Sequence, residues 1–366
     1  MQAMPDDDRF MRTALELAAR GQGLVEPNPM VGCVLVQDGQ IVGQGWHRRF
    51  GGPHAEVEAL RDAGANAAGA TMYVTLEPCC HHGKTPPCTD AVIDAGVRRV
   101  VIAMTDPFPQ VAGGGLERLK QANIEVHTGV LESEAQRLND PYLCLLKYHR
   151  PWVIAKWAMT LDGKIATWSQ DSKWISNERS RAVVHQLRGR VDAIIVGRGT
   201  VEADDPQLTA RPPGPRVATR VVCDRRASLP IRSNLVRSAR ETPVMLWTGP
   251  SALPSRCQAL VNAGCEVARA SSDEHVAGLR ELLAELGSRR MTNVLVEGGA
   301  KLLGTFLEAD LIDEVHVFVA PKLIGGGQSA TTGRGVEFIA DATRLDHVRS
   351  TNLDGDLHIS GRVVRR

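Results

Sequence analysis

Hydrophobic residues recur with two different periods along the first 147 residues. Phe10, Ala14, Leu17 and Ala18 fall on one face of a helix that follows the acidic cap at residues 6–8. Apolar runs on both sides of Gln37–Gln40, which contains Asp-Gly, predict a tight hairpin. The same reading predicts helices at 54–63, 89–95, 116–122 and 132–146, and strands at 31–36, 41–42, 72–76, 99–104 and 124–128. Helices alternating with short strands predict a three-layer α/β/α domain.

A second α/β pattern begins after residues 147–151, where a predicted helix ends and Pro151 opens a β-rich run. Strands are predicted at 152–157, 193–196, 219–223, 244–247, 294–296 and 314–320, and helices at 178–188, 255–263, 274–286 and 301–307. Asp354-Gly355 predicts a closing hairpin. We therefore expect two domains, residues 1–147 and 148–366.

Composition narrows the classes of function. The 366 residues are 43% hydrophobic and 23% charged, with a formal net charge of +1, and only 4% are aromatic. A nucleic-acid-binding protein usually carries a basic stripe or stacking aromatics, so a small-molecule substrate is favoured. The eight cysteines do not form a disulfide framework, and no apolar run is long enough to cross a membrane. The expected location is the cytoplasm, with no membrane partner.

A metal-binding pattern lies in the first domain. His54 and Glu56 are followed by Cys79 and, after eight intervening residues, by Cys88. One histidine and two cysteines leave the fourth position of a tetrahedral zinc site open for water, as in catalytic sites. The order His-x-Glu, Pro-Cys and a second Cys is the signature of zinc-dependent nucleobase deaminases. Glu56 is placed to move the proton of the water, which zinc activates at neutral pH.

The alternative is a closed structural zinc site, in which Cys80, His81 or His82 fills the fourth position. Adjacent cysteines rarely bind one metal together, and Glu56 would then have no purpose. The other cysteines are interpreted as buried small apolar residues: Cys33, Cys144, Cys223, Cys257 and Cys265.

Longer motifs resemble one family over essentially the whole chain. Residues 27–32 (PNPMVG), His54-Ala55-Glu56 and the run from Glu77 to Cys88 resemble RibD, the bifunctional deaminase-reductase family of riboflavin biosynthesis. The resemblance implies a cytidine-deaminase-like amino-terminal domain that deaminates 2,5-diamino-6-(5-phosphoribosylamino)pyrimidin-4-one. Its implied zinc ligands are His54, Cys79 and Cys88, with Glu56 as catalytic proton shuttle.

The resemblance also implies that Asn28 and Lys84 contact this phosphorylated pyrimidine, an amide reading base edges and an ammonium meeting phosphate. Their plainer interpretations are a turn residue and a solvated loop lysine. One motif departs from the family, which commonly has Asp-Pro-Asn-Pro where this chain has Asp106-Pro107-Phe108-Pro109. Phenylalanine cannot replace the hydrogen bonds of an amide.

The second half resembles the reductase domain of that family, which has a dihydrofolate-reductase-like α/β fold and uses NADPH. The matching stretches are 156–166 (KWAMTLDGKIA), 171–176 (DSKWIS), 196–208 (VGRGTVEADDPQL) and 296–305 (VEGGAKLLGT). The last stretch predicts a strand, a Gly-Gly turn and a helix start that can approach a phosphate. No G-x-G-x-x-G follows a predicted strand, which disfavours a standard Rossmann site.

Matching these motifs residue by residue implies two ligand sets in the reductase domain. The implied substrate contacts are Lys156, Ser172, Arg188, Leu208, Arg211 and Glu297. Arginine suits phosphate because its planar fork binds two oxygens, so Arg188 and Arg211 are the expected phosphate partners. The implied NADPH contacts are Ala158, Trp174, Thr200, Asp204, Gly299, Ala300, Lys301, Leu302, Leu303, Gly304 and Thr305.

The implied second reaction is NADPH-dependent reduction of the ribosyl group to ribityl, with Lys156 and Glu297 as candidates for polarising or protonating the sugar. Arg225 and Arg226 after the 219–223 strand are candidates for the 2′-phosphate of NADPH. The family likeness favours a homo-oligomer, a dimer first. Two alternatives stay open: a reductase with a deaminase domain made defective at Phe108, and a nucleic-acid deaminase.

Overall fold

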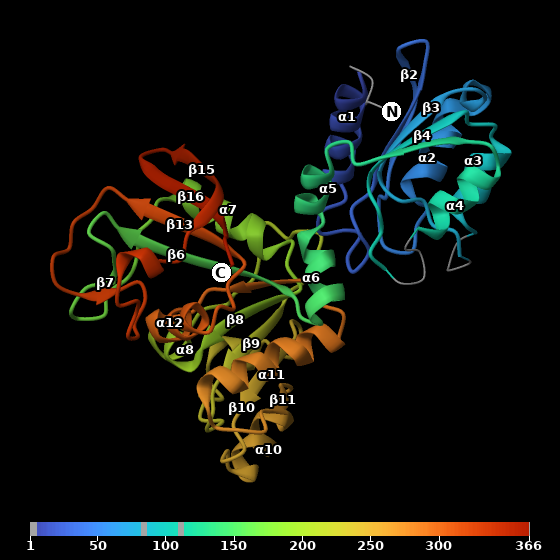
Figure 1. The fold of residues 1–366 in the computed structure, drawn as a ribbon. Helices are drawn as coiled ribbons and strands as arrows, with labels where there is room; N and C mark the ends of the chain where they lie inside the picture. Colours follow the sequence, from blue (N-terminus) through green and yellow to red (C-terminus); the bar gives the residue numbers. More distant parts are fainter. Residues whose placement is uncertain (1–5, 82–85, 109–112, 366) are drawn as a thin grey trace. The chain divides into compact units, whose positions relative to one another are not determined.

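Two units make up the chain, Met1–Tyr148 and His149–Arg366 (Figure 1). The computed structural model describes residues 6–81, 86–108 and 113–365. Each unit is built from one contiguous stretch and has its own β-sheet. The units meet in sequence at Tyr148 and His149, within the stretch 147–151 where the seam is predicted.

Among the described residues of the first unit, five strands form one sheet in the order β2-β1-β3-β4-β5. The hairpin β1–β2 is antiparallel, β1 also pairs antiparallel with β3, and β3, β4 and β5 run parallel. The strands are β1 (Gly32–Gln37), β2 (Gln40–Trp46), β3 (Thr71–Leu76), β4 (Arg99–Met104) and β5 (Glu125–Thr128). Parallel order in β3–β5 places their carboxyl ends at one edge, where the zinc motif follows β3.

Helices cover both faces of this sheet, so the predicted three-layer architecture is confirmed. On one face, Ala59, Val92 and Leu119 pack against strand residues such as Met72 and Ile102. On the other face, α1 and α5 bury residues such as Phe10 and Ala135. The helices are α1 (Asp7–Ala19), α2 (Ala55–Ala63), α3 (Cys88–Asp94), α4 (Gly114–Gln121), α5 (Glu132–Leu138) and α6 (Asp140–Tyr148), and a short 3₁₀ turn covers Gly64–Ala67.

Strand β2 has no side chain at Gly45, which lets α2 pack directly on the strand. A Cβ on Gly45 would lie 2.4 Å from Ala59 N and 2.5 Å from Ala55 O. Neighbouring Gly43 is equally close to the helix, since its Cβ would lie 2.5 Å from Ala59 O. The close approach fixes the start of α2, and His54 is the residue that immediately precedes it.

The predicted helix at 132–146 is wrong in one respect, because the structure breaks it at Asn139 into α5 and α6. The Asn139 side chain is buried and both accepts a hydrogen bond from Met30 N (2.8 Å) and donates one to Met30 O (3.0 Å). Asn139 lies between the two helices, and its side chain is fixed by the backbone of a residue far away in the sequence. Hydrophobic periodicity does not reveal such a contact.

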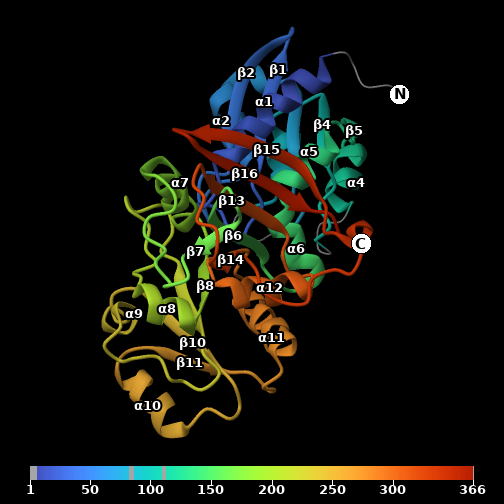
Figure 2. The same cartoon turned by 90° about the vertical axis from the view of Figure 1, so that its left-hand side faces the viewer.

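In the described part of the second unit, nine strands form a mixed sheet in the order β11-β10-β9-β8-β12-β6-β13-β16-β15. The seven strands from β11 to β13 in this order are parallel to one another. Strand β16 pairs antiparallel with β13 and, through a turn at Asp354-Gly355 as predicted, with β15 at the edge. Figure 2 shows β10 and β11 at one end of this sheet and β15 and β16 at the other.

The strands of the second unit are β6 (Trp152–Thr160), β8 (Ala193–Gly197), β9 (Thr219–Cys223), β10 (Val244–Thr248), β11 (Glu266–Arg269), β12 (Asn293–Val296), β13 (Glu314–Ala320), β15 (Leu345–Leu353) and β16 (Asp356–Val363). A separate ribbon pairs β7 (Lys164–Ala166) with β14 (Gln328–Ser329). The helices are α7 (Glu178–Arg188), α8 (Arg198–Asp204), α9 (Asn234–Arg237), α10 (Pro254–Asn262), α11 (His275–Ser288) and α12 (Ala300–Glu308), with a 3₁₀ turn at Ile339–Asp341.

Two apolar cores lie on opposite faces of the large sheet. Leu282, Leu286 and Phe306 of α11 and α12 fill one, and Leu187 and Leu260 of α7 and α10 contribute to the other. Helices on both faces and parallel central strands make this a second α/β architecture. Its ligand crevice is expected outside the carboxyl ends of β8, β9, β10 and β12, near the change of strand order.

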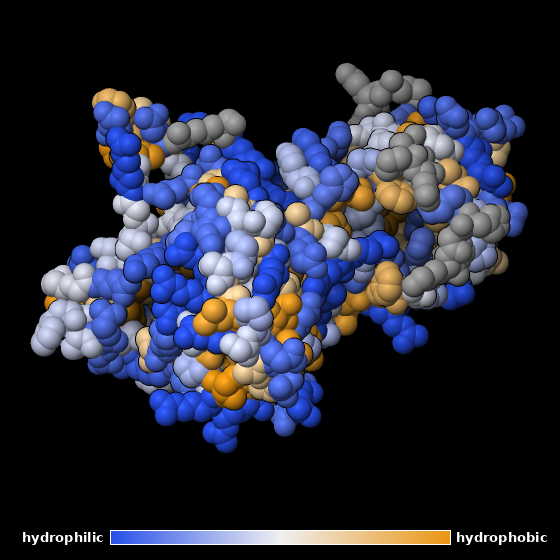
Figure 3. All heavy atoms as spheres, turned by 90° about the horizontal axis from the view of Figure 1, so that it is seen from below, coloured by the Kyte–Doolittle hydropathy of each residue, from blue (hydrophilic) through white to orange (hydrophobic). Residues whose placement is uncertain are grey.

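No helix in the described part of the chain is long and apolar enough to span a bilayer. On the face shown in Figure 3, apolar residues form patches that are interrupted by hydrophilic ones.

Candidate active sites

Three side chains of the first unit converge as the sequence predicts. His54 is the N-cap of α2, Cys79 lies in the loop after β3, and Cys88 is the first residue of α3. The His54 Nδ1 atom lies 3.2 Å from Cys88 Sγ and 3.6 Å from Cys79 Sγ. Two helix starts and a loop after a strand therefore place three potential ligand atoms within 4.8 Å of one another.

This donor set fits zinc. Tetrahedral zinc at about 2.3 Å from sulfur and about 2.1 Å from nitrogen holds those atoms roughly 3.6 Å apart. A hydrogen bond from Cys88 lowers the pKa of Cys79 to about 4, while the pKa of Cys88 is raised well above its usual value. A bound dication favours the ionised form of both thiols.

The closed structural site gains no support from the described residues, because neither Cys80 nor His81 belongs to the ligand group. His82 lies outside the described residues, and so does Lys84, the expected phosphate contact. The three ligands leave one tetrahedral position available for water.

Glu56 lies in the first turn of α2 and is 3% exposed. Burial raises the pKa of its carboxyl group, and the neighbouring His54 opposes that rise. A carboxyl group with a raised pKa can accept and return a proton near neutral pH. The residue lies two positions after a ligand, so the same helix start places both groups.

Sequence reasoning missed His47, which the structure places beside Asn28. The Asn28 Nδ2 atom lies 3.4 Å from His47 Nε2, and His47 Nδ1 lies 2.9 Å from Pro53 O. Donation from Nδ1 to the Pro53 carbonyl leaves Nε2 as acceptor for the Asn28 amide. The His47 ring also contacts the His54 ring edge-on, with centroids 5.4 Å apart. The available signal was its position at the end of the hairpin strand, seven residues before His54.

Sequence reasoning also missed the role of Glu77, whose buried carboxylate holds the loop between β4 and α4. One oxygen accepts hydrogen bonds from Asp106 N (3.3 Å) and Gly113 N (3.1 Å). The other accepts from Gly115 N (2.9 Å) and Leu116 N (3.2 Å). Both described ends of this loop are therefore hydrogen-bonded to Glu77, which lies two positions before Cys79.

Asp106 and Phe108, where the motif departs from the family, lie at the start of that loop. The Asp106 carboxylate accepts hydrogen bonds from Phe108 N (3.0 Å) and from the Tyr142 hydroxyl (3.0 Å). Burial raises the pKa of Asp106. The Phe108 ring lies near His81, with centroids 6.4 Å apart. Asp106 is thus engaged by its own loop and by Tyr142 of α6.

In the second unit, Glu297 lies between two cations. Arg188 donates to it from Nε (2.6 Å) and Nη2 (2.8 Å), and Lys156 Nζ is 3.8 Å away. Burial alone would raise the pKa of Glu297, but Arg188 and Lys156 outweigh burial and hold it at about 2. Burial lowers the pKa of Lys156. Strands β6 and β12 are paired neighbours, which brings Lys156 and Glu297 together.

The other expected substrate residues lie in loops and are held locally. Ser172 Oγ donates to Asp204 Oδ1 (3.3 Å). Arg211 N donates to His185 Nδ1 (3.2 Å), and its guanidinium contacts Gln207. Leu208 is buried with a positive φ of 54°. Because Arg188 is engaged by Glu297, Arg211 is the more available cation for a substrate phosphate.

Among the expected cofactor residues, Thr200 Oγ1 accepts a hydrogen bond from Gly299 N (3.0 Å), which joins α8 to the start of α12. Trp174 is exposed and Arg181 lies 4.7 Å from its ring centroid. Ala158 lies on β6 in register with Phe318 of β13.

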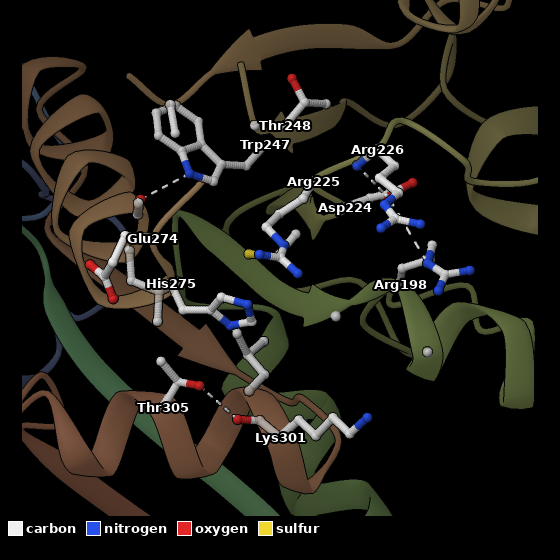
Figure 4. A pocket seen from close by; sticks show the side chains of 18 of the residues that line it. Arg198, Asp224, Arg225, Arg226, Trp247, Thr248, Glu274, His275, Lys301 and Thr305 are labelled. Carbon is white, nitrogen blue, oxygen red and sulfur yellow. Dashed lines mark hydrogen bonds and ion pairs between the residues drawn. The ribbon is translucent and has the colours of Figure 1, made fainter. Parts of the chain in front are cut away.

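A cavity of about 410 Å³ lies at the carboxyl ends of β8, β9 and β10. Lys301, Leu302 and Thr305 of α12 line it, as Figure 4 shows for Lys301 and Thr305. Ala158, Trp174, Thr200 and Asp204 do not line this cavity. Its place outside the carboxyl ends of parallel strands, with arginines and a helix start in its wall, fits one end of a phosphate-bearing dinucleotide.

The fold and these two sites define a zinc-binding deaminase unit followed by a reductase unit. Residues 4–104 match the cytidine and deoxycytidylate deaminase zinc-binding region, and residues 151–359 match the RibD C-terminal domain. The chain belongs to the RibD family, the bifunctional deaminase-reductases of riboflavin biosynthesis. By family, its reductase unit depends on NADPH.

Relatives match along nearly the whole chain. The riboflavin biosynthesis protein RibD of Escherichia coli is 43% identical, with 97% of this chain and 99% of that protein covered. RibD of Actinobacillus pleuropneumoniae is 42% identical over 95% of this chain and 92% of that protein.

Solved structures agree. Acinetobacter baumannii RibD superposes with a TM-score of 0.86 at 39% identity, covering 98% of this chain and 99% of that chain. A diaminohydroxyphosphoribosylaminopyrimidine deaminase/5-amino-6-(5-phosphoribosylamino)uracil reductase from Thermotoga maritima gives a TM-score of 0.84 at 38% identity, covering 98% and 99%. The predicted family and fold class are confirmed.

Proposed function

We propose that the first unit, 1–147 as bounded from the sequence, hydrolytically deaminates 2,5-diamino-6-(5-phosphoribosylamino)pyrimidin-4-one. The second unit, 148–366, then reduces the ribosyl group of the product to ribityl. The name of the Thermotoga maritima relative supports both substrates. The observation that carries the proposal is the buried Glu56 beside a three-ligand site.

His54, Cys79 and Cys88 hold the zinc ion, which supplies a water molecule activated at neutral pH. Glu56 would accept one proton of that water and deliver it to the ring nitrogen. It would then carry the second proton, from the added hydroxyl group, to the amine that leaves as ammonia. Its burial excludes bulk water from the proton path, and its raised pKa suits transfer in both directions.

Asn28 and His47 orient the pyrimidine. The Asn28 amide offers both a donor and an acceptor to a base edge, and its contact with His47 fixes which end faces the substrate. Lys84 is proposed from its motif to meet the phosphate of the ribosyl group. Glu77, two residues before the ligand Cys79, holds the described ends of the loop between β4 and α4.

In the reductase, NADPH supplies the hydride that reduces the opened imine of the ribosylamino group at its anomeric carbon. Lys156 would donate the proton that the imine nitrogen takes up as hydride adds to the anomeric carbon, because burial lowers its pKa and makes it a better acid. Glu297 keeps Lys156 in place and also holds Arg188. Ser172, Leu208 and Arg211 complete the substrate contacts, with Arg211 on the phosphate.

Residues 299–305 and Thr200 form the proposed cofactor contact at the start of α12, together with Ala158, Trp174 and Asp204 from the motif match. Hydrogen bonding of Gly299 N to Thr200 supports this arrangement, because it holds the Gly-Gly turn against α8. We further propose that the enzyme is a homo-oligomer, a dimer first, that works in the cytoplasm without nucleic-acid or membrane partners.

The test is to incubate zinc-loaded protein with the diaminopyrimidinone substrate and NADPH and to record ammonia release and NADPH loss together. Both signals are expected, and Glu56→Ala should abolish both. Supplying the deaminated intermediate should then restore NADPH loss but not ammonia release. NADPH loss only with supplied intermediate would instead identify a reductase with a defective deaminase unit, with Phe108 as the first residue to restore to asparagine.

A further inference from the structure

The cavity at the carboxyl ends of β8–β10 is lined by several charged side chains, which an uncharged adenosine would not need for binding. Its wall contains four side chains that carry a positive charge, one histidine and two acids. The charged and titratable lining residues are Arg198, Asp224, Arg225, Arg226, Glu274, His275 and Lys301.

Asp224 directly follows β9 and is one of the two acids that line the cavity. Here its buried carboxylate already accepts hydrogen bonds from Ser228 N (2.6 Å), Leu229 N (2.7 Å) and Arg226 N (3.3 Å). The Ser228 hydroxyl adds a further donor at 3.2 Å. Asp224 therefore closes the turn at 224–229 and has little capacity left for a ribose hydroxyl.

The second acid of the wall is also satisfied within the protein. Glu274 is the N-cap of α11, and its carboxylate accepts hydrogen bonds from Val276 N (2.8 Å) and Ala277 N. Such capping bonds are local and stabilise the helix start. The carboxylates of both acids in the wall are thus engaged by hydrogen-bond donors of the protein.

The arginines differ in their engagement. Arg225 Nη1 donates to Asp273 O (3.0 Å), which braces the opposite wall. Arg198 pairs with exposed Glu202 and its Nε lies 3.9 Å from Asp224 Oδ1. Across the described residues, the structure gives the Arg226 guanidinium no hydrogen-bond or ion-pair partner. Figure 4 shows Arg198 and Arg226 both next to Asp224, with Arg225 set apart from them.

We propose that Arg226, assisted by Arg198, binds the 2′-phosphate of NADPH and is the residue that discriminates NADPH from NADH. A guanidinium binds two phosphate oxygens but gains little from the neutral hydroxyl that NADH has in the same place. The Arg198–Glu202 pair is exposed, so releasing Arg198 to a phosphate costs little. Arg225 shapes the cavity. This inference rests on the NADPH-dependent reduction proposed above.

The sequence alone assigned this role to Arg225 and Arg226 together. The structure distinguishes the two arginines. Arg225 donates a hydrogen bond to Asp273 O, whereas the guanidinium of Arg226 has no partner among the described residues. The structure also adds Arg198, which lies 28 residues earlier in the chain and reaches the same turn through Asp224.

The experiment measures kcat/KM for NADPH and for NADH with the deaminated intermediate supplied. Wild-type oxidation of NADPH tests the proposed reduction itself. In Arg226→Gln, kcat/KM for NADPH should fall roughly 10- to 100-fold and that for NADH by less than about 3-fold, as expected for the loss of charged hydrogen bonds. Arg198→Gln should show a smaller loss with the same selectivity. Arg232→Gln is the matched control, an exposed arginine that does not line the cavity.

Calorimetric titration with adenosine 2′,5′-bisphosphate and with 5′-AMP gives a second readout that needs no turnover. Arg226→Gln should weaken the bisphosphate and leave 5′-AMP unchanged, and circular dichroism confirms the fold of each variant. Equal losses for NADPH and NADH, or selectivity for NADPH lost in Arg225→Gln but kept in Arg226→Gln, would overturn the inference. If wild type fails to oxidise NADPH but the titration still separates the two nucleotides through Arg226, the proposed reduction fails and this inference stands.

Discussion

Arg188 and Glu297 form a two-pronged ion pair between α7 and the end of β12, with N···O distances of 2.6 Å and 2.8 Å. Lys156 approaches the same carboxylate from β6 at 3.8 Å. A single acid thus balances two buried cations at the proposed reductase centre. The same three side chains therefore contribute to the stability of the second unit and to its proposed reaction.

Removing that acid should therefore cost stability as well as activity. We expect Glu297→Gln to lower the free energy of unfolding of the second unit by about 3 kcal/mol, because two cations lose their buried counter-charge. Urea unfolding measures the change. Glu285→Gln removes a partly exposed partner of Arg289 and should cost less than about 1 kcal/mol. Equal costs for the two variants would contradict the buried balance.

The pH dependence of this effect has a defined sign. The folded-state pKa of Glu297, about 2, lies below its ordinary 4.5, so its stabilisation is present above pH 4.5 and is lost as pH falls toward 2. The difference in unfolding free energy between wild type and Glu297→Gln should stay constant above that range and shrink below it. Urea titrations at several acidic pH values check this, and a difference that grows on acidification would refute it.

Glu56 should separate metal binding from proton transfer. Glu56→Gln keeps the size of the side chain and all three ligands, so the zinc content should remain at one per chain. Ammonia release should fall by at least about 10²-fold, because general acid–base catalysis typically contributes that much or more. Metal analysis and an ammonia assay give the two numbers, and unchanged reduction of supplied intermediate is the internal control. Loss of zinc in this variant would assign Glu56 a structural role.

Glu77 should affect the loop that follows β4 and not the metal. In Glu77→Gln an amide NH₂ faces two backbone N–H groups, so two of the four hydrogen bonds are lost, at about 2 kcal/mol of stability. We expect a higher KM for the deaminase substrate with zinc content retained. Glu117→Gln, an exposed change on α4, serves as control. A lower kcat with KM unchanged would argue against a role in positioning this loop.

The close packing of α2 on β2 makes Gly45 sensitive to a single methyl group. Gly45→Ala places Cβ 2.4 Å from Ala59 N, so the helix must shift, at about 1–3 kcal/mol. Because α2 begins directly after His54, zinc affinity measured by chelator competition should fall as well. Gly326→Ala is the control, since nothing lies within 4 Å of its added Cβ. Wild-type zinc affinity in Gly45→Ala would show that the helix start does not set the ligand position.

Features that depend on residues close together in the sequence were predictable from the sequence. The order of helices and strands followed from periodicity, and His54, Cys79 and Cys88 were identifiable because metal ligands keep their spacing. His47 and Glu77 were not, because their roles depend on which backbone groups the tertiary fold brings to them. These groups are the Pro53 carbonyl for His47, and for Glu77 the amides of Asp106, Gly113, Gly115 and Leu116. The break at Asn139 was hidden for the same reason, since its partner Met30 lies 109 residues away.

The separation of the two sheets in sequence also bears on how the protein is made. The last strand of the first sheet ends at Thr128, and the first strand of the second begins at Trp152. No strand is exchanged between the sheets in the described part of the chain. Domains fold as units and the amino-terminal one emerges first from the ribosome. The deaminase half can therefore complete its core, and assemble its zinc ligands, while the reductase half is still being translated.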